Sequence, residues 1–223
     1  MSLNLQNQIV FWNIGQGQWI TAIDSKNCYH FDVGGEFFNP KNISESCSKK
    51  QNIIYYSHWD WDHIGLTSKL KNFQRVCIAV RPQGVAKSYK LATLKIPLCE
   101  KAYSFVEKLK FNYPKSKLDN DLSQIFIYKN KLLSPGDSTK KIEKIWSPLL
   151  RNRRIKWLSV SHHGSNTSTS EFFLKNTKIN QAIISARKKA YGHPHKEVLR
   201  RLKAHRVPSI RTEEWGNIRI LTN

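Results

Sequence analysis

The sequence predicts a layered α/β or α+β domain in which sheets are covered by helices. Short apolar runs alternate with turn signals along the chain, and strands dominate the first part while strand–helix units dominate the second. Hydrophobic residues make up 39% of the 223 residues, with seven Trp, eight Tyr and ten Phe, which is enough to bury a sizeable core. Because no internal repeat or low-complexity linker divides the chain, we expect a single domain over residues 1–223.

The first part of the chain is expected to consist mainly of strands. Apolar and β-branched runs bounded by turn residues predict strands at 8–13, 18–23, 29–33, 52–57 and 76–80. The first two form a hairpin around Gly15-Gln16-Gly17. We expect a helix to start within 63–70 and another to cover 99–109.

The second part is expected to alternate strands with helices. Residues 123–128 and 131–133 predict a hairpin, and 157–160 and 182–185 predict two further strands. Helices are predicted at 169–175 and at 195–205, where Val198, Leu199 and Leu202 share one face. Residues 209–212 and 218–221 are expected to close as a terminal hairpin.

Basic residues are unevenly distributed. The chain carries 37 Lys and Arg against 16 Asp and Glu, a formal charge of +21. Residues 1–50 are neutral overall, whereas residues 151–223 hold 16 basic and four acidic side chains, a net +12. This excess predicts a polyanionic partner, most simply nucleic acid, with Arg200, Arg201 and Lys203 on the phosphate-binding face. The alternative is an ordinary solvated basic face.

The sequence also bears on localisation. Residues 1–7 have neither the basic nor the apolar region of a signal peptide, and no apolar run approaches the roughly 18 residues of a membrane span. We therefore expect a cytoplasmic protein without membrane insertion. Four widely spaced cysteines, Cys28, Cys47, Cys77 and Cys99, are expected to be reduced thiols and not a disulfide framework.

A dense group of metal-ligand side chains follows the strand at 52–57. His58, Asp60, Asp62 and His63 lie within six residues of Ser57-His58-Trp59-Asp60-Trp61-Asp62-His63-Ile64-Gly65. An apolar core would exclude all four, and the carboxylates would repel one another. A bound divalent cation removes both problems, so the segment predicts a metal site. Trp59 and Trp61 alternate with the ligands, which favours packing on the scaffold over stacking on nucleobases.

Further candidates follow later strands. Asp137 ends the segment after the hairpin at 123–133, His162 and His163 follow the strand at 157–160, and His193 and His195 follow the strand at 182–185. His195 is also suited to cap the helix that it begins. Because functional residues collect where strand ends converge on one rim, these side chains are expected near the first group.

With these motifs in order along nearly the whole chain, the sequence resembles the metallo-β-lactamase fold. It is more closely similar to the nuclease-like domain of ComEC-type competence proteins. The matching segments are Asn13 to Gly17, Phe31 to Gly35, Ser57 to Gly65, Asp119 to Ser123, Leu132 to Asp137, Val160 to Ser165, Tyr191 to His195, and Arg211-Thr212. The resemblance implies a four-layer αββα sandwich.

The chain departs from the family pattern at several positions. Gln18 stands where the family usually has Asp, Asn13 replaces another Asp, and Ser161 replaces the Pro before His-His. Ser134-Pro135 replaces the usual Thr before Gly-Asp. None of these changes removes an implied metal ligand. The family's membrane channel domain has no counterpart in these residues, so DNA import by this chain alone is not expected.

The resemblance implies two divalent metal ions. His58 and Asp60 would belong to one ion, Asp62 and His63 to the other, Asp137 would bridge them, and His162 would supply a remaining ligand. Asp60 occupies a position where most members of the fold have His, and this added oxygen favours Mn²⁺ relative to a purely Zn²⁺ site. Zn²⁺ remains suitable because Asp and His both bind it, and Mg²⁺ is a further option.

The implied reaction is phosphodiester hydrolysis by a hydroxide that two metals activate. Asp62 would hold the catalytic metal, and His163, His193 or His195 would protonate the leaving group. The residues expected to bind substrate phosphates are Ser165, Ser168, Arg187, Lys188 and Lys189.

The leading functional hypothesis is a metal-dependent DNA nuclease. One alternative is a phosphodiesterase acting on a small molecule such as a cyclic nucleotide, although the charge of +21 exceeds what a small substrate needs. The other alternative is a DNA-binding accessory subunit of a larger multi-component system, with a protein partner.

Overall fold

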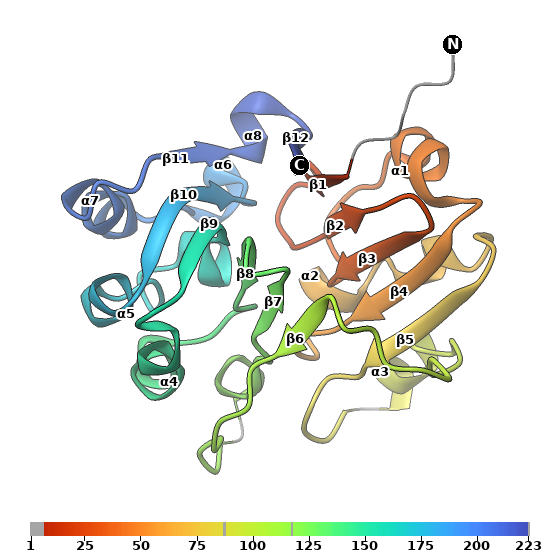
Figure 1. Ribbon diagram of the computed structural model, residues 1–223, viewed down its shortest axis with the longest axis horizontal. Helices are drawn as coiled ribbons and strands as arrows, with labels where there is room; N and C mark the ends of the chain where they lie inside the picture. Colours follow the sequence, from red (N-terminus) through yellow and green to blue (C-terminus); the bar gives the residue numbers. More distant parts are fainter. Residues whose placement is uncertain (1–6, 87, 117, 223) are drawn as a thin grey trace.

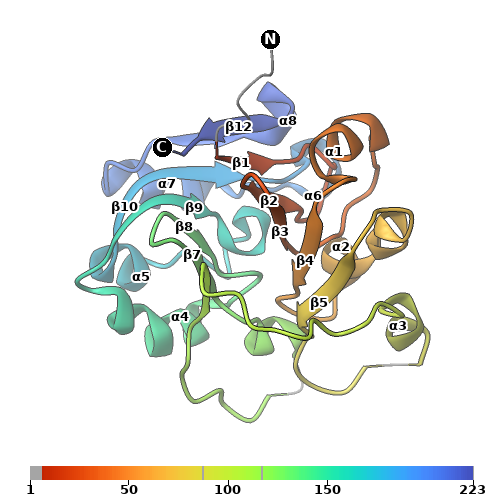
Figure 2. The same cartoon turned by 45° about the vertical axis from the view of Figure 1, so that its right-hand side comes forward.

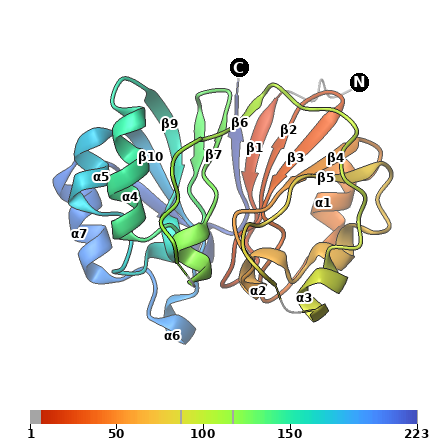
Figure 3. The same cartoon turned by 90° about the horizontal axis from the view of Figure 1, so that it is seen from below.

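Two facing sheets form the centre of the molecule. The computed structural model describes residues 7–86, 88–116 and 118–222. Each sheet has six strands, in the orders β12-β1-β2-β3-β4-β5 and β11-β10-β9-β8-β7-β6. Helices cover the outer face of each sheet, α1, α2 and α3 on one side and α4, α5 and α7 on the other (Figure 3). The four-layer αββα sandwich that the sequence resemblance implies is therefore confirmed.

The first sheet is antiparallel at one side and parallel at the other. β1 pairs antiparallel with both β12 and β2, and β3 pairs parallel with β4, which pairs parallel with β5. Its strands are β1 (Gln8–Phe11), β2 (Ile20–Ile23), β3 (Asn27–Phe31), β4 (Gln51–Tyr55), β5 (Val76–Val80) and β12 (Ile218–Leu221). The helices of this half are α1 (Pro40–Cys47), α2 (Trp61–Ile64), the 3-10 turn η1 (Thr67–Leu70) and α3 (Ser88–Thr93).

The second sheet also combines antiparallel and parallel strand pairs. β6, β7 and β8 form an antiparallel meander, and β8, β9, β10 and β11 run parallel. Its strands are β6 (Val106–Lys108), β7 (Phe126–Tyr128), β8 (Leu132–Ser134), β9 (Arg154–Ser159), β10 (Lys178–Ile184) and β11 (Ser209–Arg211). The helical segments of this half are η2 (Asp119–Leu122), α4 (Lys140–Trp146), η3 (Ser147–Leu150), η4 (Ser161–Gly164), α5 (Glu171–Asn176), α6 (Lys188–Tyr191), α7 (Lys196–Ala204) and α8 (Thr212–Trp215).

Three apolar layers hold the four structural layers together. Side chains that alternate along the strands, such as Phe31 and Phe126, fill the space between the sheets. Ile54 and Ile64 belong to the layer between the first sheet and its helices, and Trp146 belongs to the layer under α4, α5 and α7. Burial on both faces explains why β4 reads as a continuous apolar run and not as an alternating one.

Two of the expected elements are wrong. Residues 99–109 contain no helix; instead β6 pairs antiparallel with β7, and along it Val106 is buried while Glu107 is exposed. The apolar spacing that favoured a helix comes from side chains such as Tyr103, whose ring packs edge-on against Tyr29. Tertiary packing thus overrides the local pattern.

The expected terminal hairpin is also wrong. β11 pairs parallel with β10, whereas β12 crosses to the other sheet and pairs antiparallel with β1 (Figure 1). α8 fills the turn between them. The open edge of β1 provides a longer partner for β12, with Ile218 at the layer between the sheets. The other predicted strands are found within a few residues, while α1, α3 and α4 were not anticipated.

The expectation of four reduced thiols is wrong as well. Cys28 is joined to Cys47, and Cys77 is joined to Cys99. The first bond ties β3 to α1, and the second ties β5 to the segment that leaves α3, so both lie beside the first sheet. The spacing of the cysteines gave no sign of pairing because each bond joins elements that meet only in the fold.

No helix in the described ranges is long and apolar enough to cross a membrane. The expectation that no signal peptide is present falls on residues 1–7, of which 1–6 lie outside the described residues.

Candidate metal centre

The candidate site lies at one end of the two sheets, where the loops after β3, β4, β8, β9 and β10 converge (Figure 2). α2 begins directly after β4 and carries Asp62 and His63. The loop after β3 packs against the backbone of α2: the Val33 amide donates to the His63 carbonyl at 2.8 Å. Gly34 allows this approach, since a Cβ there would lie 2.3 Å from the Asp62 carbonyl oxygen.

Asp32 orients the histidines of this segment. Its carboxylate accepts hydrogen bonds from the Ser57 backbone N–H (2.7 Å) and the Ser57 hydroxyl (2.7 Å). It also lies 2.8 Å from Nδ1 of His63. Since a carboxylate accepts, His63 donates from Nδ1, which leaves the lone pair on its Nε2 free for a ligand. Ser57 Oγ already donates its hydrogen bond to Asp32, so it accepts one from Nδ1 of His58, which lies 2.9 Å away. His58 is thereby fixed in the same tautomer.

Gln18 joins the two sheets beneath the site. Its side-chain amide donates to Asp32 (2.8 Å) and to the Ser134 hydroxyl (3.1 Å), and its carbonyl oxygen accepts from Ser159 Oγ (2.8 Å). This is the position at which the family usually has Asp. A carboxylate at the same distance would repel Asp32, whereas the neutral amide donates to it. The departure therefore has a structural role in a buried network.

Asp137 enters from the second sheet, just after β8. It is 3% exposed, and its backbone N–H donates to the Ser123 hydroxyl at 3.1 Å. The preceding Gly136 has φ +53°, and a Cβ there would lie 2.6 Å from Cβ of Ser57. Glycine at 136 thus brings the Asp137 strand end against the strand end that carries His58.

His162 and His163 sit in a tight turn, η4, that follows β9. Both have left-handed backbone angles, with φ of 51° and 54°, which is uncommon outside Gly, Asn and Asp. The His162 amide donates to the Gly136 carbonyl at 3.2 Å, which anchors the turn beside Asp137. Nδ1 of His163 donates to the Ser185 carbonyl at 2.8 Å, so the lone pair of His163 Nε2 faces the site. Such backbone angles in a non-glycine pair are typical of functional sites.

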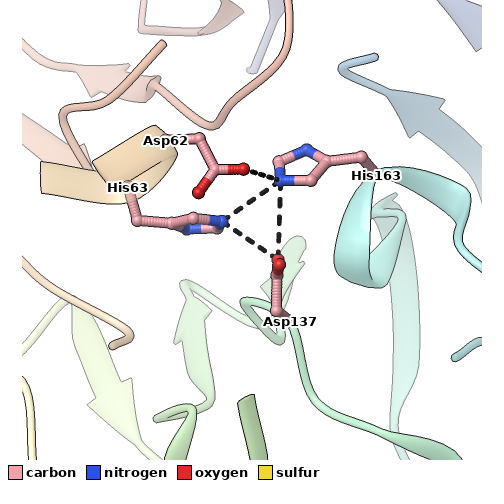
Figure 4. Close-up of side chains that lie close together, drawn as sticks. All are labelled: Asp62, His63, Asp137 and His163. Atoms are coloured by element: carbon pink, nitrogen blue, oxygen red, sulfur yellow. Dashed lines mark hydrogen bonds and ion pairs between the residues drawn. The ribbon is translucent and has the colours of Figure 1, made fainter. Parts of the chain in front are cut away.

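Four of these side chains meet closely enough to hold one cation. Asp62, His63, Asp137 and His163 each offer a ligand atom, and all four atoms lie within 4.8 Å of one another (Figure 4). His63 Nε2 is 3.0 Å from Asp137 Oδ1, and His163 Nε2 is 3.1 Å from Asp62 Oδ2 and 3.7 Å from Asp137 Oδ1. We call Asp62, His63 and His163, together with Oδ1 of Asp137, the inner ligand group.

The chemistry of these donors fits a metal ion. Nε2 of His63 and Nε2 of His163 lie 3.2 Å apart, although the Nδ1 of each ring is already committed to an acceptor. Two lone pairs that face each other repel, and a cation between them removes the repulsion. The His58 ring also favours a bound cation, because its buried Nε2 has no hydrogen-bond partner among the described residues.

A second set of donors faces the other oxygen of Asp137. His58 Nε2 lies 3.9 Å and His162 Nε2 3.6 Å from Asp137 Oδ2, and Asp60 Oδ2 is 3.3 Å from His58 Nε2. We call His58, Asp60 and His162 with Oδ2 of Asp137 the outer ligand group. It is the more open of the two, because Asp60 is 39% and His162 26% exposed, whereas in the inner group only Asp62, at 33%, is exposed to a similar degree.

The electrostatics keep the carboxylates ionised. Burial raises the pKa of Asp137, but the neighbouring His63 and His163 outweigh burial and hold that pKa well below its ordinary value. For Asp62, burial is likewise outweighed, by His163 at 3.1 Å and by His63 when these rings are protonated in the absence of a metal, and its pKa is lowered. For Asp60 the main cause of the lowered pKa is the nearby His58, whose Nε2 lies 3.3 Å away and attracts the carboxylate when the ring is protonated in the absence of a metal. Ionised carboxylates are the form that binds metal.

The remaining predicted histidines lie at the rim. His193 is half-buried, its ring centroid is 6.2 Å from that of His162, and burial together with the nearby His162 lowers its pKa. His195 is the N-cap of α7, and its Nδ1 accepts from the Glu197 backbone N–H at 3.2 Å. The structure therefore brings His58, Asp60, Asp62, His63, Asp137, His162 and His163 together, with His193 beside them and His195 occupied in capping.

The predicted phosphate-binding residues divide into buried and exposed ones. Ser168 is fully buried and donates to the carbonyls of Ser161 and Ser165, so its hydroxyl braces the loop. Ser165 is 8% exposed, and its Oγ lies 2.9 Å from Thr167 Oγ1. Lys188 and Lys189 are exposed on α6, and the partly exposed Arg187 forms an ion pair with Glu36 at 2.7 Å.

Arg201 does not lie on an open basic face as expected. It is 6% exposed, and its guanidinium donates to the carbonyls of Thr169 and Ser168. The buried guanidinium therefore stabilises the loop that follows η4 by hydrogen bonds to its backbone. Arg200, by contrast, is exposed and pairs with Glu197.

Sequence reasoning also missed several residues that contact the site. Lys90 of α3 places its Nζ 3.7 Å from Asp60 and 3.8 Å from Asp119. Asn120 Nδ2 lies 3.3 Å from Nε2 of His162. Asp32 was noted only as part of a turn motif. A lysine on a short helix gives no sign in the sequence of where it points, whereas the position of Asp32 at a strand end was a usable signal.

These features define the class of protein. The overall arrangement is similar to two solved structures, each 12% identical in sequence: the metallo-β-lactamase fold protein YhfI from Bacillus subtilis (TM-score 0.58, covering 92% of this chain and 95% of that one) and a diphosphatase from the PhnP family (TM-score 0.55, covering 97% and 98%). The chain therefore has the metallo-β-lactamase fold, with a candidate metal centre at the rim of its two sheets.

Sequence comparison narrows the resemblance to ComEC-like competence proteins, as the motifs indicated. The chain is 28% identical over 189 residues to ComE operon protein 3 of Bacillus subtilis, and 35% identical over 109 residues to Recombination protein 2 of Haemophilus influenzae. These matches cover 76% and 47% of the chain, but only 24% and 14% of the relatives. Competence protein ComA of Neisseria gonorrhoeae is 37% identical over 87 residues, 38% of the chain and 13% of that protein. No protein-family model matches the sequence.

Proposed function

We propose that this protein is a metal-dependent phosphodiester hydrolase that acts on nucleic acid, with DNA as its substrate. The observation that carries the proposal is the division of donors about Asp137. Its Oδ1 faces His63 and His163, and its Oδ2 faces His58 and His162. One buried carboxylate placed between two donor sets is suited to a pair of cations, the arrangement that phosphodiester-cleaving metal sites use.

The residues of the chain have separate roles in this proposal. Two bound divalent ions would supply the Lewis acidity and the nucleophile at neutral pH. Asp32 and the Ser185 carbonyl hold His63 and His163 in the tautomer that presents Nε2 to the site. His163 is therefore better placed as a ligand than as the proton donor. His193, at the rim and half-buried, remains the candidate that protonates the leaving oxygen.

Charge and relatives support a polyanionic substrate. The formal charge of +21 is far more than a small phosphodiester would require, and exposed Lys188, Lys189 and Arg200 lie on the second half of the chain. Two of the relatives carry names that refer to recombination and to competence, which favours DNA over RNA. We also propose that the chain works with a protein partner in a larger multi-component system, since it matches at most a quarter of the length of those relatives.

The test uses purified protein with Mn²⁺, Zn²⁺ or Mg²⁺ on labelled linear, circular and single-stranded DNA and on RNA. We expect cleavage of DNA that requires the added metal and disappears in Asp137→Ala. Cleavage of cyclic nucleotides without cleavage of DNA would support the small-molecule phosphodiesterase instead. Metal-independent DNA binding without hydrolysis of any substrate would support an accessory subunit.

The two disulfides bear on the compartment. Disulfides persist in oxidising environments and are rare in the reducing cytoplasm. We propose that the chain works in an oxidising compartment, in place of the cytoplasm that the sequence suggested. Protein taken from its natural host can be alkylated without reduction and its mass measured. We expect none of the four cysteines to be alkylated, because all are in disulfides; alkylation of Cys28 and Cys77 would contradict this.

A further inference from the structure

A groove beside the inner ligand group is walled by exposed aromatic rings. Its volume is about 360 Å³, within the range of about 300–1,000 Å³ that is usual for small-ligand sites. Trp61, Asp62 and Tyr191 line it together with Gln16 and Glu36. Trp61 is 46% exposed and Tyr191 is 52% exposed, although large aromatic side chains are normally buried. The groove therefore presents two ring faces to solvent next to a predicted metal ligand.

Both rings are held in place by neighbouring side chains. Tyr89 of α3 stacks on Trp61 with ring centroids 5.7 Å apart and planes 15° apart. Tyr89 is not among the described residues that line the groove, so it supports the Trp61 ring from outside it. The Tyr191 hydroxyl donates to Glu36 at 3.2 Å. Rings that are fixed before binding lose little conformational freedom when a ligand stacks on them. This bracing distinguishes the groove from scattered exposed aromatics.

The polar surroundings fit a nucleotide. Asp62 contributes both to the groove lining and to the inner ligand group, so a substrate phosphate at the metals lies next to the groove. Arg187 pairs with Glu36 at 2.7 Å, and its guanidinium lies 6.0 Å from the Tyr191 ring centroid. A cation is thus held at the same wall as the aromatic ring. Aromatic platforms combined with basic side chains are the usual means of binding single-stranded nucleic acid.

We infer that this groove is a nucleobase subsite, in which an unpaired base of the substrate stacks on Trp61 and Tyr191 while its phosphate lies at the metal centre. The inference rests on the proposed function. Inside a duplex both faces of a base are already covered by its neighbours, so only an unpaired or terminal base can enter. The preferred substrate is therefore single-stranded DNA or a frayed end.

The test compares oligonucleotides that carry a single abasic position with the intact strand. In the wild-type protein with Mn²⁺, an abasic nucleotide beside the cleaved bond should lower kcat/KM by about 5- to 150-fold, the range for losing one stacked base. Trp61→Leu and Tyr191→Leu should lower kcat/KM on the intact strand, and the abasic position should then cost little more. Trp61→Phe should retain most of the activity.

Two controls separate this effect from general damage. Trp215→Leu removes an aromatic ring that is 72% exposed and outside the groove lining, and it should behave like the wild type. Tyr191 lies on α6, which carries none of the candidate metal ligands, so metal content should be unchanged in Tyr191→Leu. An abasic penalty that persists in full in both Leu variants would overturn the subsite.

Binding provides a readout that does not depend on catalysis. An oligonucleotide containing 2-aminopurine should lose fluorescence on stacking when wild-type protein is added in EDTA, and Trp61→Leu should reduce that loss. If the wild type cleaves no nucleic acid under any metal, the proposed function fails, and the fluorescence still decides whether the groove stacks a base. Equal quenching by wild type and both Leu variants would reject the groove.

Discussion

The two ligand groups on either side of Asp137 are built differently. In the inner group, His63 and His163 are fully or almost fully buried, and each ring is oriented from behind by a carboxylate or a carbonyl. In the outer group, His58 is also buried and oriented by Ser57, but Asp60 is 39% exposed and His162 26% exposed. Asp60 is moreover held by Lys90, a cation of the protein itself.

The comparison teaches that the ligands of the inner group are largely oriented before an ion binds, whereas those of the outer group are less fully oriented. Ligands whose rotamers are already fixed lose little entropy on binding, so the inner group should bind its ion more tightly. In the outer group, Lys90 competes for the charge of Asp60 and His162 is partly exposed, so this group should bind its ion less tightly. We therefore expect two unequal metal affinities, and the following predictions test that inequality.

The largest effect is expected for Asp137→Ala, because both groups lose a shared ligand. Hydrolysis should fall to the level of the metal-free protein, and elemental analysis should find less than one ion per chain. Asp119→Ala, which also removes an acidic side chain near Lys90, should keep both ions. Undiminished metal content in Asp137→Ala would exclude a bridging role.

The adjacent histidines should separate the two groups. His163→Ala should remove the tightly held ion, which otherwise survives dialysis against a weak chelator, whereas His162→Ala should leave it in place and lose only the weaker one. Both changes remove the same side chain from the same turn, so each is a control for the other. The opposite order of metal loss would reverse our assignment of inner and outer groups.

Asp32→Asn tests the bracing of the inner group. The amide keeps the shape of the carboxylate but removes the charge that orients His63, and loss of such a partner typically costs about 10- to 100-fold in metal affinity. A Zn²⁺ or Mn²⁺ titration followed by calorimetry measures it. Asp24→Asn, in a turn after β2 and away from the site, should not change either affinity. An unchanged tight affinity in Asp32→Asn would show that His63 needs no such support.

Lys90→Met should produce the smallest change, and in the opposite direction. Removing a cation from Asp60 leaves that carboxylate free for the outer ion, and partly exposed ion pairs of this kind are worth about 0.2–1 kcal/mol, or up to roughly fivefold in affinity. The weaker Mn²⁺ affinity should therefore rise slightly. Lys141→Met, beside Asp121, is the matched control. Weaker Mn²⁺ binding in Lys90→Met would mean that the lysine supports the outer group.

The sequence was informative about the inner and outer ligands for a physical reason. His58, Asp60, Asp62 and His63 are contiguous, so their density alone indicates a metal, and the strand ends before Asp137 and His162 are visible as apolar runs. The fold resemblance rested on the same motifs. These parts depend on local order along the chain.

What could not be predicted depends on contacts across the fold. β12 was assigned to a hairpin because its partner, β1, lies at the other end of the sequence. The two disulfides and the approach of Lys90 to Asp60 are invisible for the same reason. Trp61 was expected to pack on the scaffold, as Trp59 does, yet its ring is half exposed because α2 turns it outward.

The pairing of β1 with β12 has a consequence for how the chain is made. Gln8 pairs with Leu221, 213 residues later, so the first sheet cannot complete its edge until nearly the whole segment has been synthesised. At about 5–20 residues per second, β1 waits roughly 10–40 s for its partner. During translation that strand exposes unpaired backbone groups, the usual starting point for aggregation. The β1–β2 hairpin covers only the opposite edge of β1, so the edge that pairs with β12 stays open during that interval.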